Sequence, residues 1–223
     1  MESLQKDAVS STAQFCLLRG MPEARLAERI RNASTFEGKS IPPILFGSAA
    51  SNLFTERKRV ITDLDYVLPE AACISVTGLK SAGIKVLAIH QDSDGAMSQY
   101  NMLDLVSGDH VTLVMFPQLL YQKMLIDSPM AHTTNQRMYV IHPAFLVALK
   151  CRRVMYAKSS QDLEKIGTDR RDIREIIRSV YGNPAFFRRA ESDRLASYRI
   201  RHPEQESMHN VIDDAFKKIR RIE

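Results

Sequence analysis

Two aspartates interrupt an otherwise apolar stretch of the chain. Val60 to Leu68 have the sequence VITDLDYVL, which predicts a β-strand that Pro69 ends. Residues two apart on a strand point to the same face, so Asp63 and Asp65 project together, about 6.6 Å apart along the strand. Burying two like charges side by side is costly unless a cation joins them, and carboxylate oxygens are ligands that Mg²⁺ prefers. The pair predicts a site where one or two Mg²⁺ ions bridge the phosphates of a nucleotide, although such a triplet also arises by chance on exposed strands.

A second feature lies upstream of the aspartates. The apolar run Ile44-Leu45-Phe46 ends in Gly47-Ser48, and residues 48–55 are predicted to form a helix that opens from this glycine. Glycine lets a phosphate approach the backbone, the start of a helix offers free N–H groups, and the serine hydroxyl adds a donor. Ser48 could instead simply cap its helix. Gly47-Ser48 is significant because of its place in an ordered series: a strand, Gly-Ser, a helix, a basic loop and a strand with two aspartates.

This order resembles the nucleotidyltransferase superfamily with the polymerase β-like fold. The resemblance is specific over residues 41–68, and 14 residues separate Ser48 from Asp63, slightly more than the family pattern has. It implies that Gly47 and Ser48 hold the phosphates of a nucleoside triphosphate (NTP). It also implies that Asp63 and Asp65 hold Mg²⁺, or Mn²⁺ in its place, and that one of them helps to deprotonate an acceptor hydroxyl.

Within the superfamily, the chain is most similar to the abortive-infection type of nucleotidyltransferase toxin. In that branch a helix after the sheet carries a lysine, and the next helix carries an acidic pattern. The matching residues here are Lys150 and Asp172, with Asp169 nearby. The likeness implies that Lys150 contacts the nucleotide phosphates and that Asp172 orients Lys150 or acts as a base. A salt bridge between two helices is the alternative for the same two residues.

The expected third carboxylate of the metal site is missing from the sequence. Many members of the superfamily place it on a later strand, and the corresponding run, Val111-Thr112-Leu113-Val114, has Thr112 there. A threonine cannot replace an anionic ligand, so a two-metal mechanism is in doubt. Asp104, on the preceding predicted strand, is the candidate that would supply the charge instead.

The wider pattern predicts an α/β (α+β) fold. Helices over 22–33, 48–55 and 70–82 alternate with strands over 44–46, 60–68 and 84–89, and two further strands, 102–106 and 111–116, flank a turn at 107–109. From Pro143 the chain is predicted to be helical, over 144–156, 161–181, 184–196 and 206–221. We therefore expect a nucleotidyltransferase-like domain with a mixed sheet over residues 1–142 and a helical domain over residues 143–223.

Charge and composition limit the classes of partner. Residues 1–149 carry 13 Lys and Arg against 14 Asp and Glu, whereas residues 150–223 carry 18 against 12. The basic C-terminal third, with Arg152, Arg153, Arg170 and Arg171, could face a triphosphate or RNA, or could form ordinary solvated helix faces. No apolar run approaches the roughly 18 residues of a membrane span, and the three scattered cysteines indicate reduced thiols. We expect a cytoplasmic protein without a membrane partner.

Three hypotheses follow from these features. The first is a Mg²⁺-dependent, toxin-like nucleotidyltransferase that moves a nucleoside monophosphate from an NTP to a hydroxyl of a tRNA end, another RNA, a protein or a small molecule, with an antitoxin-like partner. The second is a catalytically weakened nucleotide- or RNA-binding protein of the same fold, in which Thr112 marks the loss of the metal site. A third is an unrelated α/β domain in which the pattern arose by chance.

Overall fold

The computed structural model describes residues 14–16, 22–55, 60–91, 98–128, 130–132, 137–156 and 163–182. The chain divides into two compact units, Met1–Leu53 with Arg59–His142, and Phe54–Lys58 with Pro143–Glu223. No helix among the described residues is long and apolar enough to cross a membrane. The predicted helices at 184–196 and 206–221 lie outside the described residues.

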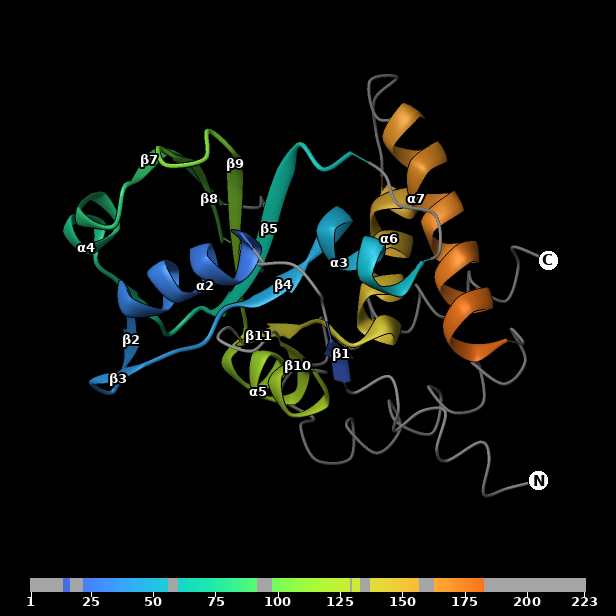
Figure 1. Ribbon diagram of the computed structural model, residues 1–223, viewed down its shortest axis with the longest axis horizontal. Helices are drawn as coiled ribbons and strands as arrows, with labels where there is room; N and C mark the ends of the chain where they lie inside the picture. Colours follow the sequence, from blue (N-terminus) through green and yellow to red (C-terminus); the bar gives the residue numbers. More distant parts are fainter. Residues whose placement is uncertain are drawn as a thin grey trace. The chain divides into compact units, whose positions relative to one another are not determined.

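The first unit contains a mixed sheet of eight strands (Figure 1). Its strand order is β1-β10-β11-β4-β5-β9-β8-β7, in which β4 and β5 are antiparallel, β5 and β9 parallel, and β9, β8 and β7 successively antiparallel. This arrangement confirms the predicted α/β class with a mixed sheet. The strands are β1 (Gln14–Cys16), β4 (Ile44–Phe46), β5 (Asp63–Pro69), β7 (Ile84–Gln91), β8 (Ser98–Asp104), β9 (His110–Phe116), β10 (Met130–His132) and β11 (Arg137–Val140).

A second, three-stranded antiparallel sheet and several helices complete this unit. The small sheet has the order β3-β2-β6. Its strands are β2 (Ser34–Phe36), β3 (Lys39–Ser40) and β6 (Cys73–Ile74), and the helices are α2 (Pro22–Asn32), α3 (Gly47–Phe54), α4 (Val76–Ser81) and α5 (Gln118–Asp127).

The helix predicted over 70–82 is wrong in its first half. Residues 73–74 pair with β2 as strand β6, and the helix begins only at Val76. Ser75 explains the late start, because its side chain accepts a hydrogen bond from the Gly78 N–H at 2.9 Å and so caps α4. Helix propensity alone could not detect the strand pairing that precedes the cap.

The two faces of the main sheet follow from the alternation along β5. Leu64 and Tyr66 point to one face, where the Tyr66 hydroxyl donates to the Glu23 carbonyl oxygen of α2 at 2.7 Å. Burial raises the pKa of Tyr66 well above its usual value, so this hydroxyl keeps its proton. Asp63 and Asp65 point to the opposite face. Helix α2 therefore covers the face that does not carry the two aspartates.

The second unit is helical throughout its described elements, as predicted. It contains α6 (Pro143–Tyr156), α7 (Leu163–Ile176) and the short π-helix η2 (Ile177–Tyr181). The apolar stripe predicted for 161–181 is buried at Ile173, Ile176 and Ile177. Gly182 adopts a left-handed conformation, with φ 64°, and ends η2.

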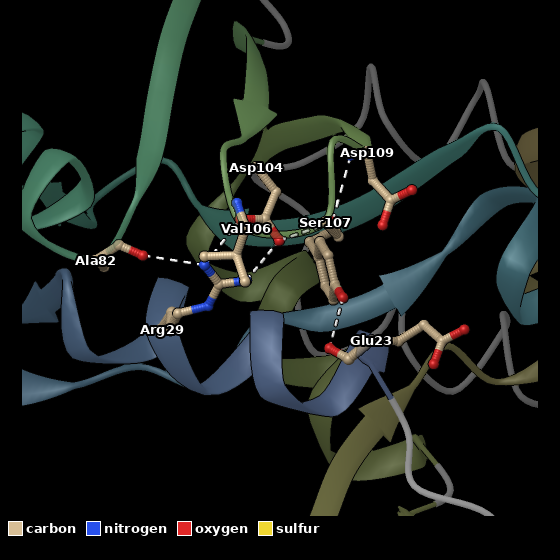
Figure 2. A network of polar contacts seen from close by, with 8 residues as sticks. Glu23, Arg29, Ala82, Asp104, Val106, Ser107 and Asp109 are labelled. Atoms are coloured by element: carbon tan, nitrogen blue, oxygen red, sulfur yellow. Dashed lines mark hydrogen bonds and ion pairs between the residues drawn. The ribbon is translucent and has the colours of Figure 1, made fainter.

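An ion pair ties helix α2 to the far strands of the sheet (Figure 2). The Arg29 guanidinium donates to both carboxylate oxygens of Asp104, at 2.8 and 2.5 Å, and also to the Ala82 carbonyl oxygen at 3.0 Å. Asp104, only 2% exposed, also accepts from the Val106 N–H and the Ser107 hydroxyl. Burial raises the pKa of Asp104, but these hydrogen bonds, Arg29's first, outweigh burial and lower it overall.

We expect Asp104→Asn to lower the free energy of unfolding by about 3 kcal/mol at pH 7, because it leaves the half-buried Arg29 guanidinium without its anion. A carboxyl whose pKa is lowered by folding adds stability above its unfolded pKa of about 3.9 and loses it as the pH falls through the folded pKa. The difference between wild type and variant should therefore shrink below about pH 4. Urea denaturation across this pH range measures it.

Asp109→Asn is the matched control, because it removes the same charge from the other end of the same turn. Among the described residues, the Arg29 guanidinium pairs with Asp104, whereas the Asp109 side chain points away from it (Figure 2). A pH-independent difference for Asp104→Asn, or an equal loss in both variants, would contradict the assignment of the ion pair as a main support of this unit.

Candidate functional site

Asp63 and Asp65 lie at the start of β5, near the middle of the large sheet. Both are half-buried, and the Thr62 hydroxyl donates to Asp63 Oδ1 at 3.3 Å. The register pairs Asp65 with Phe46 on β4 and with Thr112 on β9, and it pairs Asp63 with His110. The predicted strand and the shared face of the two carboxylates are therefore present, although β5 begins at Asp63 and not at Val60.

Gly47 brings the start of α3 against the Asp65 carboxylate. Its φ is +68°, and a Cβ added at this position would lie 1.9 Å from Asp65 Oδ2. Only glycine allows this approach, because any other side chain would occupy the space of the carboxylate. The Gly-Ser pair and the two aspartates, separated in the sequence, thus meet in one place within the first unit.

Ser48 occupies the first turn of α3 and is half-buried. The backbone N–H groups of a first helical turn have no partners within the helix, and the helix dipole favours an anion there. Ser51 donates to the Gly47 carbonyl oxygen at 2.9 Å and so supports the same turn. The first turn of α3, which begins beside the Asp65 carboxylate, therefore carries both backbone N–H groups and the Ser48 hydroxyl.

Thr112 lies on β9, at the position where the family resemblance leads us to expect a third carboxylate. It is the register partner of Asp65, so the two side chains share one face of neighbouring strands. Asp104 does not replace it. Leu103 is the register partner of His110 and therefore lies on the face of the two aspartates. Asp104 is the next residue along β8, so its side chain points to the opposite, α2 face, where Arg29 pairs with it.

The donor set fits a single Mg²⁺ ion better than two. Among the described residues no group of three or more His, Cys, Asp or Glu side chains could hold a metal ion. Mg²⁺ commonly binds one or two carboxylates together with substrate phosphates and water. Asp63 and Asp65 supply two carboxylates, and the first turn of α3, with its backbone N–H groups, begins beside Asp65.

Lys150 and Asp172, the other predicted site residues, contact each other in the second unit. Lys150 Nζ lies 2.8 Å from Asp172 Oδ2 and 3.0 Å from Asp169 Oδ1. Lys150 is 3% exposed and Asp169 fully buried. Arg153 also donates to both oxygens of Asp169. We call Lys150, Arg153, Asp169 and Asp172 the α6–α7 charge cluster; its two cations and two anions balance.

Within this cluster Lys150 has the partners of a buried structural ion pair. The contact with Asp172 is an ion pair between α6 and α7, and the proposed role of Asp172 in orienting Lys150 for a nucleotide stays a prediction. The charge of the Lys150 ammonium is already offset by two buried carboxylates, which occupy two of its three N–H donors. Contact of Lys150 with phosphate therefore stays a prediction from the family resemblance.

The remaining arginines and the nearby cysteine have simpler environments. Arg170 and Arg171 are exposed on α7, and the side chain of Arg152 lies outside the described part. Burial, together with the charge of Asp169, raises the pKa of Cys151 to about 12. The Cys151 thiol therefore stays protonated and is a poor nucleophile.

The sequence predicted neither the role of Asp169 nor the position of two amides on β8. Asp169 lies one helical turn before Asp172, so a spacing of three on α7 was the available signal. Gln99 and Asn101 lie two apart on β8 and share the face of Asp65 and Thr112. The strand predicted over 102–106 began too late to include them; β8 covers Ser98–Asp104.

Comparison with known proteins identifies no family. No protein-family model matches the sequence, and no curated protein is similar to it at a significant level. Among solved structures, the chain is similar to an antigenic nucleotidyltransferase-like protein from Paracoccidioides brasiliensis, with 15% identity, a TM-score of 0.41 and coverage of 92% of this chain and 93% of that chain. A likeness of this size does not by itself assign a function.

We expect Gly47→Ala to displace the Asp65 carboxylate and to destabilise the first unit. The new Cβ would overlap Asp65 Oδ2, and a left-handed alanine adds backbone strain of about 1 kcal/mol. Gly108→Ala is the control, because Gly108 also has a positive φ, +81°, but an added Cβ meets nothing within 4 Å. Chemical denaturation should show the larger loss for Gly47→Ala; equal losses would contradict the steric role of Gly47.

We expect Lys150→Met to cost about 3–5 kcal/mol of unfolding free energy, because it leaves Asp169 and Asp172 buried beside each other. Arg153→Met removes one cation from the same cluster, but the Arg153 side chain is 53% exposed and Asp169 keeps Lys150. Its loss should be smaller, about 1 kcal/mol. Urea denaturation compares the two variants, and a loss at Arg153 as large as at Lys150 would refute a central role for Lys150.

Proposed function

We propose that this chain is a Mg²⁺-dependent nucleotidyltransferase that moves a nucleoside monophosphate from an NTP to an acceptor hydroxyl. The observation that carries the proposal is the close approach of Gly47 to the Asp65 carboxylate. This approach brings the start of a helix, where backbone N–H groups favour an anion, next to the carboxylate pair that we propose as the metal ligands. These are the two parts that phosphoryl transfer needs, because it depends mainly on positioning and charge neutralisation.

Each residue has a distinct role in the proposed reaction. The backbone at Gly47 and the Ser48 hydroxyl bind the β- and γ-phosphates. Asp63 and Asp65 hold Mg²⁺, which would neutralise phosphate charge when bound. The acceptor oxygen forms a new bond to the α-phosphorus, the bond from that phosphorus to the bridging oxygen breaks, and pyrophosphate leaves with the bonding electrons. One of the two carboxylates accepts the hydroxyl proton.

The finer assignments are carried by sequence alone. Lys150 is proposed to offset charge on the leaving pyrophosphate, with Asp172 as its positioning residue. The basic C-terminal third favours RNA, such as a tRNA end, as the acceptor over a protein or a small molecule. A toxin-like role, an antitoxin-like partner and a cytoplasmic location remain predictions from the resemblance and the composition.

A second candidate function rests on Thr112. Because this neutral residue is the register partner of Asp65, the site has two carboxylates where an active two-metal site would have three. A protein with this site would bind a nucleotide or RNA without turning it over. The two candidates differ in whether nucleotide binding depends on the metal.

We expect ATP, CTP, GTP or UTP with Mg²⁺ to raise the melting temperature of the wild type, and the double variant Asp63→Asn/Asp65→Asn to lose this effect. A nucleotide at 100 times its dissociation constant adds about 2.7 kcal/mol of stability, which a melting curve resolves. Glu70→Gln is the control, because Glu70 is an exposed carboxylate directly after β5.

The outcomes separate the two candidates. Stabilisation that requires Mg²⁺ and both aspartates supports the transferase, and incubation with labelled NTP and tRNA then tests transfer. Stabilisation that is independent of the metal and of the aspartates supports the binding protein. The transferase proposal is falsified if none of the four nucleotides stabilises the wild type at millimolar Mg²⁺.

A further inference from the structure

A row of neutral polar side chains continues from Asp65 across the sheet. Asp65 is the register partner of Thr112 on β9, and Thr112 is in turn the partner of Asn101 on β8. Gln99, two residues before Asn101, lies on the same face. We call Thr112, Asn101 and Gln99 the amide strip. Figure 1 shows that β9 and β8, which carry the strip, lie side by side next to β5, which carries Asp65.

The two amides of the strip hold each other in place. Gln99 Nε2 donates to Asn101 Oδ1 at 2.7 Å. This bond leaves the Asn101 amide nitrogen as a donor and the Gln99 amide oxygen as an acceptor. All three strip residues are half-buried, so their polar groups are restricted in position and still reachable. The strip therefore presents a donor next to an acceptor.

The side chains around the strip favour a ligand that has a neutral polar part and a negatively charged part. On this face β7 contributes Lys85, Ala88 and His90, which are the partners of Leu103, Asn101 and Gln99. Lys85 and His90 are exposed, and β9 adds the exposed His110. Ala88 places a small side chain beside Asn101 and so leaves room there. On β7, β8 and β9, the described residues that point to this face include no carboxylate.

We propose that the amide strip binds the nucleobase of the nucleotide whose triphosphate lies at Gly47 and Asp65. This inference rests on the proposed function. A base edge presents an adjacent donor and acceptor, and asparagine and glutamine amides pair with such edges. Asn101 lies two interstrand spacings from Asp65, roughly 9.6 Å. That separation places a base over the strip when its phosphates are at the two aspartates.

The test compares each of the four NTPs with inorganic tripolyphosphate, which carries the phosphates but no base. Isothermal calorimetry with Mg²⁺ gives both affinities for the wild type, Gln99→Met and Asn101→Leu. These variants keep the size of each side chain and remove its hydrogen bonds. We expect at least one NTP to bind the wild type about tenfold more tightly than tripolyphosphate. Each variant should lose most of that advantage and bind tripolyphosphate as the wild type does.

Gln122→Met is the matched control, because Gln122 is an exposed amide on α5 in the same unit. Circular dichroism and melting curves establish that all three variants fold. An NTP advantage that survives in both strip variants overturns the inference. The inference is also overturned if a nucleoside binds at saturating NTP and the strip variants weaken that binding. The strip would then bind the base of an acceptor and not the base of the NTP.

Failure of the proposed function has a separate signature. If tripolyphosphate does not bind the wild type in the presence of Mg²⁺, the phosphate and metal site is absent, and the inference falls with it. If tripolyphosphate binds and the strip variants do not change NTP affinity, the phosphate and metal site stands and only the assignment of the base is wrong.

Discussion

The site depends on the missing side chain at position 47. Because Gly47 has no Cβ, helix α3 can begin directly against the Asp65 carboxylate. The Cβ of any other residue at this position would overlap that carboxylate. The positive φ of Gly47 turns the chain sharply from β4 into α3. One residue thus sets both the direction of the helix and the spacing between its N–H groups and the carboxylate. The proposed chemistry requires both.

The carboxylates on the two faces of the central strands have different environments. On the α2 face, the bidentate Arg29 neutralises Asp104, which also accepts two further hydrogen bonds. This carboxylate stabilises the fold. On the other face, Asp63 and Asp65 stay half-buried beside the neutral Thr112. A buried, fully paired carboxylate has little capacity left to bind a ligand. The sheet therefore separates a structural carboxylate, Asp104, from the two carboxylates that we propose as Mg²⁺ ligands.

Local patterns predicted much of the fold, and their failures share one cause. Strand β5, helices α2 and α6 and the hairpin turn at 107–109 follow from alternation, helical spacing and turn residues, which are properties of neighbouring residues. The short strands β6, β10 and β11 were missed, because two to four residues carry too little pattern of their own. Such strands form because a distant strand offers hydrogen bonds, as β2 does for β6. The charge cluster was foreseen only in part, since the Lys150 partner Asp169 depends on how α6 and α7 pack.

The sequence by itself determined that two aspartates share one face of a strand and that a glycine opens a helix upstream, because both follow from the geometry of a few consecutive residues. Only the tertiary structure decided that Gly47 touches Asp65, that Thr112 is the lateral neighbour of Asp65, and that Asp104 lies on the opposite face. These relations depend on strand register and on the packing of α2. Register is set by pairing between segments far apart in the chain, which no local pattern encodes.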